Sequence, residues 1–282
     1  MSGIAAYTRP HTVDEAVASL ATGNSQILAG GTDFYPALGE RVPRAPIVDI
    51  SALTELRGIT REANHFRIGS LTTWTDIVHA TLPSCFNALK DAAREVGSIQ
   101  IQNRGTVAGN LCNASPAADG VPPLLVLDAE VELLSHVGRR QIPLHEFLIG
   151  NRKTKRLSDE LLTAVLIPNA PGNVRSVFLK LGARRYLVIS ISMVATALTF
   201  GENDRVLDAR VAVGACSAVA RRLPRLEQDL IGASRLERSH RVKGDHLTEL
   251  SPIDDVRATA AYRVDATLRL VKRALELCGG PR

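Results

Sequence analysis

The chain has 282 residues, of which 45% are hydrophobic and 22% are charged, and its formal net charge is +5. A chain of this length can bury two or three compact cores without disulfide bonds, and an aromatic content of only 4% argues against nucleic-acid binding by base stacking. Because no 18-residue apolar run and no N-terminal signal sequence are present, we expect a cytoplasmic protein without a membrane span.

The first predicted elements form a small α/β unit. The segment from Thr12 to Glu15 has the pattern of a capping box, which opens a helix that runs to about Leu20. Short apolar runs at residues 27–28 and 47–50 predict two strands of the same unit.

A glycine-containing turn, Ala29-Gly30-Gly31-Thr32-Asp33, follows the first of these strands and leads into a helix or loop. Glycine tolerates positive φ and has no Cβ, so successive N–H groups can converge on an anion such as a phosphate. The turn does not read GxGxxG, and no GxxxxGK[ST] occurs, which argues against a Rossmann domain. Taken alone, the turn is also typical of a simple strand connection.

A second glycine-containing turn, Thr106-Val107-Ala108-Gly109-Asn110-Leu111, lies in the middle of the chain. Both turns carry hydroxyl or amide side chains, and together they suggest a bound dinucleotide. The elements predicted around it are a strand at residues 66–69, a helix capped by residues 73–76, a helix at 89–96, and strands at 131–134 and 162–167.

Residues 169–173 have the composition of a linker, and we place a domain boundary there. Beyond it, the apolar run Tyr186–Phe200 predicts a buried strand, Val206–Val213 alternates like a strand, and Leu226–Ile231 is amphipathic. Residues 256–277 predict one long helix. Its apolar face is predicted to comprise Ala260, Val264, Leu268, Val271 and Leu275.

Metal-binding patterns are absent from the sequence. The four cysteines lie far apart without CxxC, so we expect no zinc or iron–sulfur cluster on this chain, and Cys112 is interpreted as a small buried residue. His240 and His246 lie in a polar stretch that we expect to be exposed. The densest basic run, residues 152–156, predicts a solvated loop, with a docking surface for an acidic partner as the alternative.

The residues that begin at the second turn resemble a known family. They read Thr-x-x-Gly-Asn-x-x-x-Ala-Ser-Pro-x-x-Asp-x-x-Pro from Thr106, and an Ala-Gly-Gly-Thr-Asp turn precedes them. This pattern is similar to the FAD-binding (medium) subunit of the molybdenum hydroxylases, the group that includes xanthine dehydrogenase and aerobic carbon monoxide dehydrogenase. The resemblance covers nearly the whole chain, from residues 7–10 to motifs at 208–214 and 255–263.

The resemblance implies an α+β fold in three parts. A two-part FAD-binding domain of the PCMH/vanillyl-alcohol-oxidase type would occupy residues 1–50 and 51–170, and a C-terminal α/β domain of the CO dehydrogenase flavoprotein type would occupy 171–282. It implies FAD as cofactor and, in a dimer of heterotrimers, a small [2Fe-2S] subunit and a large molybdopterin subunit as partners. Electrons would pass from the clusters through FAD to NAD+ or another acceptor, and because the cofactor carries the chemistry, no catalytic residue is expected here.

The resemblance also implies cofactor-binding residues. The N–H groups of the first turn and the backbone of the second would support the pyrophosphate, and Asn113 stands where the family uses a hydroxyl-bearing residue. Leu162 matches a backbone contact to the flavin ring, and Lys180, otherwise a solvated strand residue, matches a lysine near its pyrimidine end. The implied set is Ala29, Gly30, Gly31, Thr32, Asp33, Phe34, Thr106, Ala108, Gly109, Asn110, Asn113, Asp119, Leu162 and Lys180.

The sequence departs from the family pattern at two places. Leu187-Val188 stands where xanthine dehydrogenase-like chains carry an acidic pair, and Glu95-Val96-Gly97 stands where some members have an aromatic residue near the flavin. The electron acceptor and the substrate of the complex therefore stay open. The alternatives are a self-sufficient FAD-dependent oxidase of the same flavin fold and a FAD-free scaffold subunit.

Overall fold

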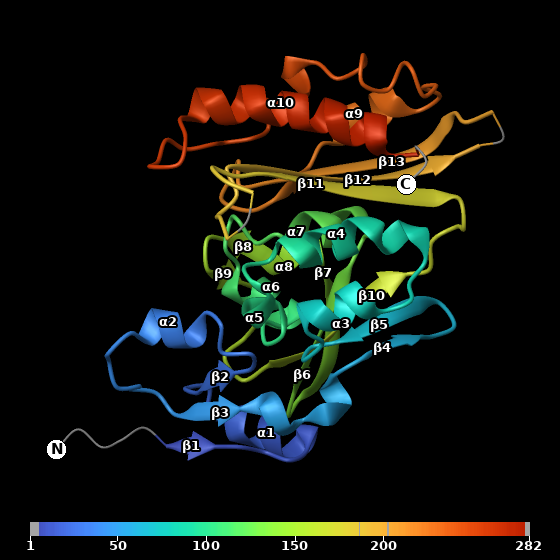
Figure 1. Cartoon of the computed structure of the whole chain (residues 1–282). Coiled ribbons are helices and arrows are strands. Elements are labelled where there is room, and N and C mark those ends of the chain that lie inside the picture. Colours follow the sequence, from blue (N-terminus) through green and yellow to red (C-terminus); the bar gives the residue numbers. More distant parts are fainter. Residues whose placement is uncertain (1–5, 186, 202, 280–282) are drawn as a thin grey trace.

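The structure is a computed structural model that describes residues 6–185, 187–201 and 203–279. Figure 1 shows three stacked parts: a small N-terminal sheet, a central sheet with its helices, and a C-terminal sheet beneath α10 and α9. Helices and largely antiparallel sheets alternate along the chain, which confirms the α+β class. Among the described residues, no helix combines the length and the apolar composition needed to cross a bilayer.

The N-terminal part is a three-stranded parallel sheet of order β1-β3-β2. Its elements are β1 (Tyr7–Thr8), α1 (Val13–Leu20), β2 (Gln26–Leu28), α2 (Phe34–Leu38), β3 (Ile47–Asp49) and the 3-10 helices η1 (Ile50–Ala52) and η2 (Thr54–Leu56). The capping box predicted for α1 is half formed. Thr12 Oγ1 accepts the Glu15 N–H at 3.2 Å, but the Glu15 carboxylate accepts the N–H of His11 and not that of Thr12.

The central part is a five-stranded antiparallel sheet of order β4-β5-β10-β6-β7. Its strands are β4 (Ile59–Arg61), β5 (His65–Gly69), β6 (Glu130–Ser135), β7 (Gly138–Pro143) and β10 (Leu161–Pro168), with a separate hairpin of β8 (Leu148–Gly150) and β9 (Lys153–Thr154). Its helices are α3 (Trp74–His79), η3 (Ser84–Phe86), α4 (Asn87–Glu95), α5 (Ile99–Gln102), α6 (Val107–Asn113), α7 (Val121–Val126) and α8 (Leu144–Phe147). The strands and helices predicted for this region are all confirmed.

The C-terminal part is a four-stranded antiparallel sheet of order β11-β12-β13-β14. Its elements are β11 (Val174–Leu181), β12 (Ser192–Phe200), β13 (Val206–Gly214), β14 (Arg221–Arg222), α9 (Pro224–Leu230), η4 (Gly244–Leu247) and α10 (Ala260–Leu277). Helices α9 and α10 cover one face of this sheet, and α4 and α7 lie against the other (Figure 1). One hydrophobic core therefore runs from Leu89 and Leu124 to Phe178, Met193 and Ala212. The sheet changes near residue 170 while the core continues, and the domain division stays a prediction.

The long C-terminal helix starts later than predicted. Asp255 and Ala258 form an isolated bridge, and Thr259 caps the first turn, so α10 begins at Ala260 and not at residue 256. Its buried face also differs, because Val264 is 37% exposed. The residues that α10 buries are Arg263, Ala266, Thr267, Val271, Ala274 and Leu275.

The apolar run from Tyr186 to Phe200 is a strand only from Ser192 onward. Tyr186 lies outside the described residues, and Leu187 and Ile189 are 54% and 61% exposed. The reason is topological: β11 ends at Leu181 and pairs antiparallel with β12, so the intervening residues form the connection between the two strands.

Candidate functional site

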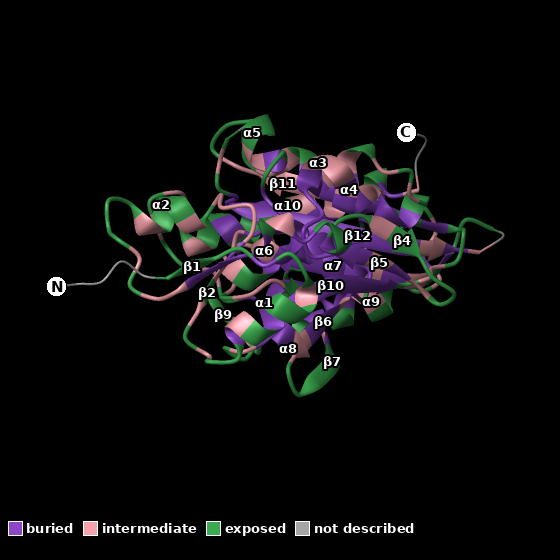
Figure 2. Ribbon diagram, turned by 90° about the horizontal axis from the view of Figure 1, so that it is seen from below, coloured by how far each residue is buried: buried purple, intermediate pink, exposed green. Residues whose placement is uncertain are grey.

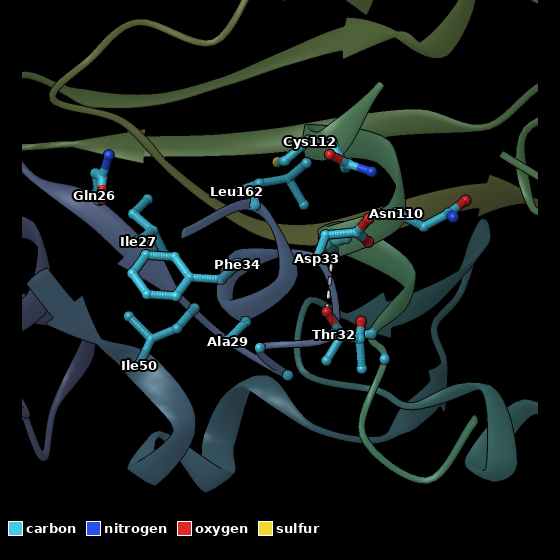
Figure 3. Close-up of a pocket in the computed structure, with 18 of the residues that line it drawn as sticks. Gln26, Ile27, Ala29, Thr32, Asp33, Phe34, Ile50, Asn110, Cys112 and Leu162 are labelled. Carbon is cyan, nitrogen blue, oxygen red and sulfur yellow. Dashed lines mark hydrogen bonds between the residues drawn. The ribbon is translucent and has the colours of Figure 1, made fainter. Parts of the chain in front are cut away.

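A cavity of about 850 Å³ lies where the N-terminal and central parts meet. Its walls come from the β2–α2 turn, the start of α6, the β8–β9 hairpin and the beginning of β10 (Figure 3). Helix α2, which has no buried residue and lies on the outside of the molecule (Figure 2), contributes Phe34, Ala37 and Leu38 to the lining. The volume lies within the range of sites for small molecules and cofactors.

Twelve of the fourteen residues implied as cofactor-binding line this one cavity, so the structure brings both glycine-containing segments to a shared site. They are Ala29, Gly30, Gly31, Thr32, Asp33, Phe34, Thr106, Ala108, Gly109, Asn110, Asn113 and Leu162. Asp119 and Lys180 are not among the lining residues. That each of these fourteen residues contacts a cofactor stays a prediction.

The first turn presents a row of free amide groups. Strand β2 ends at Leu28, and the chain bends through Gly31, whose φ is +77°, before α2 begins at Phe34. Among the described residues, the N–H groups of residues 30–34 donate no hydrogen bond. Because unpaired backbone N–H groups are rare in folded proteins, five in a row on residues that line a cavity are suited to an anionic ligand.

Gly30 is required for a reason that the sequence did not reveal. A Cβ at this position would lie 1.9 Å from the carbonyl oxygen of Arg104, so the first turn packs directly on the segment that enters α6. This close approach is what places the two glycine-containing segments side by side. The absence of a side chain at Gly30 thus serves the packing of two backbone segments.

The second glycine-containing segment is the start of a helix and not the open turn that the sequence suggested. Thr106 is the N-cap of α6, and its Oγ1 accepts the Gly109 N–H at 3.0 Å, while the Val107 N–H donates to the carbonyl oxygen of Thr72. The Gly109 N–H is therefore already paired. What Gly109 offers the cavity is the lack of a side chain.

Two buried oxygen atoms beside the cavity lack partners. The Asn110 Oδ1 and the Ser70 Oγ each have no hydrogen-bond partner among the described residues, and both residues line the cavity. Orphaned buried polar atoms are costly, and a ligand with N–H or O–H donors would satisfy them. FAD has both kinds of group: a diphosphate that the free N–H groups of the first turn could bind, and hydroxyl and imide groups that could donate to these oxygens.

The cavity also has an apolar side, where Ile27, Phe34 and Ile50 lie together (Figure 3). Cys112 was expected to be a small core residue, but it is exposed, and its surface opens into the cavity. Protein atoms packed around the rest of the Cys112 side chain raise the pKa of its thiol to about 11. The Cys112 thiol is therefore protonated at neutral pH and is not poised as a nucleophile.

The sequence analysis missed the positive charge of the cavity. Four arginines line it, against the one carboxylate of Asp33: Arg41, Arg44, Arg152 and Arg156. Arg152, Lys153 and Lys155 are exposed, as expected for residues 152–156. The alternate positions 152, 154 and 156 also line the cavity, whereas Lys155 pairs with Glu146 at 3.0 Å. The period-two alternation of a strand was the signal that could have revealed these residues.

Asp119 and Lys180, which do not line the cavity, form a buried ion pair. The Lys180 Nζ donates to Asp119 Oδ2 at 2.7 Å and to the carbonyl oxygen of Glu95 at 3.1 Å. Asp119 Oδ1 accepts the hydroxyl of Ser190 at 2.8 Å. Burial raises the pKa of the Asp119 carboxyl, and the Lys180 ammonium opposes that shift. The interpretation of Lys180 as a solvated strand residue is therefore wrong.

The histidine-containing stretch differs from expectation at one position. His246 is buried, and its Nε2 lies 3.0 Å from Asp229 Oδ2, whereas His240 is exposed. In the part of the chain that the structure describes, no three His, Cys, Asp or Glu side chains are grouped to hold a metal ion.

Two family profiles cover almost the entire chain. Residues 2–170 match the FAD-binding domain in molybdopterin dehydrogenase, and residues 178–277 match the C-terminal domain of CO dehydrogenase flavoproteins. The chain is 32% identical to the xanthine dehydrogenase FAD-binding subunit of Escherichia coli O157:H7, over 99% of both chains. It is 39% identical to the nicotinate dehydrogenase FAD-subunit of Eubacterium barkeri, over 66% of this chain and 65% of that one.

A solved structure supports the same fold. Carbon monoxide dehydrogenase from Hydrogenophaga pseudoflava, in a form that lacks the Mo-pyranopterin moiety of the molybdenum cofactor, superposes with a TM-score of 0.86. The superposition covers 98% of this chain and 97% of that one at 25% identity.

Proposed function

Because the chain belongs to the FAD-binding subunits of the molybdenum hydroxylases, we propose that it relays electrons between [2Fe-2S] clusters of a small partner subunit and a soluble acceptor such as NAD+. A large molybdopterin subunit would oxidise the substrate, and the assembly would be a dimer of heterotrimers in the cytoplasm. FAD supplies a group that exchanges electrons singly or in pairs. The chain itself binds FAD, orients it and limits the access of water to it.

The observation that carries this proposal is the row of unpaired N–H groups at residues 30–34, which line the same cavity as Ser70 and Asn110, whose side-chain oxygens lack partners. An anion with hydroxyl or imide donors satisfies both sets at once.

Reconstitution tests the proposal. We expect the purified chain to bind FAD, to co-purify with iron and molybdenum when expressed with its partners, and to have its bound flavin bleached by NADH without air. Bleaching only by a different donor would replace NAD+ as the acceptor. Turnover of a small substrate by the isolated chain, free of iron and molybdenum, would establish a self-sufficient oxidase and refute the relay.

A further inference from the structure

Arg152, which lines the cavity, and Ala114, which is buried next to it in the fold, both have an uncommon backbone conformation. Arg152, between β8 and β9, has a φ of +54°, and Ala114, directly after α6, has a φ of +46°. Residues with a Cβ adopt positive φ at a cost in free energy, and they do so where surrounding contacts hold them. The Arg152 N–H donates to the Ala114 carbonyl oxygen at 2.9 Å, so each of these residues fixes the other.

The side chain of Arg152 is held by a second contact. Its Nη1 donates to the Asn113 Oδ1 at 2.6 Å, and the described residues offer no acceptor to its other N–H groups. Arg156, in contrast, donates to the carbonyl oxygens of Leu157 and Glu160. Arg152 is thus a cavity-lining arginine that is oriented by the protein and keeps free donors.

Asn113 has a hydrogen-bond partner within the protein, which bears on how it would act at the cofactor site. Its side-chain oxygen accepts a hydrogen bond from the Arg152 guanidinium and so orients that side chain. A guanidinium presents N–H groups in a planar fork that matches two phosphate oxygens, which gives it a geometric preference for phosphate over a neutral ring. The cavity around it carries more positive than negative charge.

We propose that Arg152 binds the diphosphate of FAD through its free guanidinium N–H groups, and that Asn113 is a positioning residue that acts through Arg152. This inference rests on FAD as the cofactor of the chain. It adds a charged side chain to a diphosphate site otherwise built from backbone amides of the first turn.

The first experiment measures the Kd of FAD for the full chain after the flavin has been removed, by quenching of flavin fluorescence. Arg152→Gln should raise the Kd about 10- to 100-fold, the usual effect of losing a hydrogen bond to a charged group. It should also flatten the dependence of the Kd on salt concentration, a change that a merely structural role would not produce. Arg152→Lys should keep most of the salt dependence but recover only part of the affinity.

The matched control is Lys153→Gln, which removes one positive charge from the neighbouring position that does not line the cavity. Its Kd should equal that of the wild type. Circular dichroism of each flavin-free variant checks that the fold is kept. An unchanged Kd and salt dependence for Arg152→Gln would overturn the inference, whereas failure of the wild-type chain to bind FAD would contradict the cofactor and with it the proposed function.

A double-variant cycle tests the role of Asn113. If Asn113 acts through Arg152, then Asn113→Ala should weaken FAD binding on its own but add nothing when Arg152→Gln is already present. Additive losses would show that Asn113 contacts the cofactor itself and would refute the positioning role. A changed flavin reduction potential in Arg152→Gln at unchanged affinity would place the guanidinium beside the isoalloxazine and refute the diphosphate assignment.

Discussion

Gly109 lies on α6 where a side chain has little room. A Cβ there would lie 2.8 Å from the Thr106 Oγ1, the atom that caps the helix. We expect Gly109→Val to displace Thr106, to narrow the cavity and to lower the affinity for FAD by about tenfold or more. The ratio of flavin to protein in the purified chain measures the effect.

The matched control is Gly172→Val, because a Cβ at Gly172 meets nothing within 4 Å. Its flavin content should be that of the wild type. If Gly109→Val also retains its flavin, α6 does not approach the cofactor and the second half of the site is wrongly assigned.

The buried pair of Asp119 and Lys180 makes a separate prediction about stability. Asp119→Ala would leave the Lys180 ammonium, only 6% exposed, without its carboxylate partner. Removing one member of a buried ion pair typically costs about 3–5 kcal/mol, whereas replacing both by apolar residues costs much less. We therefore expect urea unfolding of the flavin-free chain to show a large decrease in the free energy of unfolding for Asp119→Ala. The double variant Asp119→Leu/Lys180→Met should recover a substantial part of that free energy.

Equal losses in the single and double Asp119 variants would contradict this account, because they would show that packing around the pair matters more than its charge. The measurement uses the flavin-free chain so that a change in cofactor binding does not enter the free energy of unfolding.

At the scale of single residues, the sequence predicted the turn residues of the cavity better than its charged side chains. Gly31 and Thr32 follow from local turn chemistry, which a sequence carries in full. Arg152 and Asn113 meet through a hydrogen bond between positions 39 residues apart, so neither local pattern nor composition could have revealed their partnership.

Among secondary-structure elements, predictions succeeded where a local pattern decides the outcome. The capping box at Thr73 and Asp76 opens α3, and the alternation at residues 206–213 is β13. The start of α10 was misplaced because the Asp255–Ala258 bridge and the Thr259 cap precede it. Its buried face was misplaced because Arg263 is buried, with a 2.7 Å contact to Asp255. A buried arginine on a helix face defeats any prediction that counts only apolar residues.

The central sheet carries a buried carboxylate whose ionisation should appear in the stability of the protein. Burial alone would raise the pKa of Glu132, but hydrogen bonds from Arg67 and Thr163 outweigh it and hold the pKa below its usual value near 4.5. A carboxyl group whose pKa is lower in the folded state stabilises the protein fully at pH values above its unfolded pKa. This stabilisation is lost as the pH falls from the unfolded pKa to the lower folded pKa.

We expect the free energy of unfolding to fall between about pH 6 and pH 3, and Glu132→Gln to remove part of that decline. At neutral pH the free energy of unfolding of Glu132→Gln should be about 1–3 kcal/mol lower than that of the wild type, because Arg67 loses its charged partner. Urea titrations at several pH values give both numbers. A pH profile identical to that of the wild type would show that other carboxylates, such as Glu160 with Arg140, account for the decline.

Across the whole molecule, the three parts are joined more tightly than the sequence indicated. The linker composition of residues 169–173 predicted a boundary, and the sheet does change there. Burial, however, is continuous through the crossing of β10, α7 and β12 in the centre of the molecule (Figure 2). Local composition predicts where the chain turns, but it does not predict that β11, β12 and β13 cover α4 and α7.

Removal of the C-terminal sheet is the sharpest test of this arrangement. All residues that line the cavity fall between Ser25 and Leu162, so a fragment of residues 1–170 keeps the complete site. It also exposes the apolar faces of α4 and α7 that β11, β12 and β13 cover in the full chain. Because a layer of helices must bury its apolar stripe against a second layer, we expect the fragment to aggregate or to unfold without cooperativity, and to bind no FAD.

Calorimetry and flavin titration of the fragment beside the full chain measure both properties. A monomeric fragment that unfolds sharply and binds FAD would show that the cavity depends only on its own residues, and that the C-terminal sheet is an independent addition to the flavin-binding part.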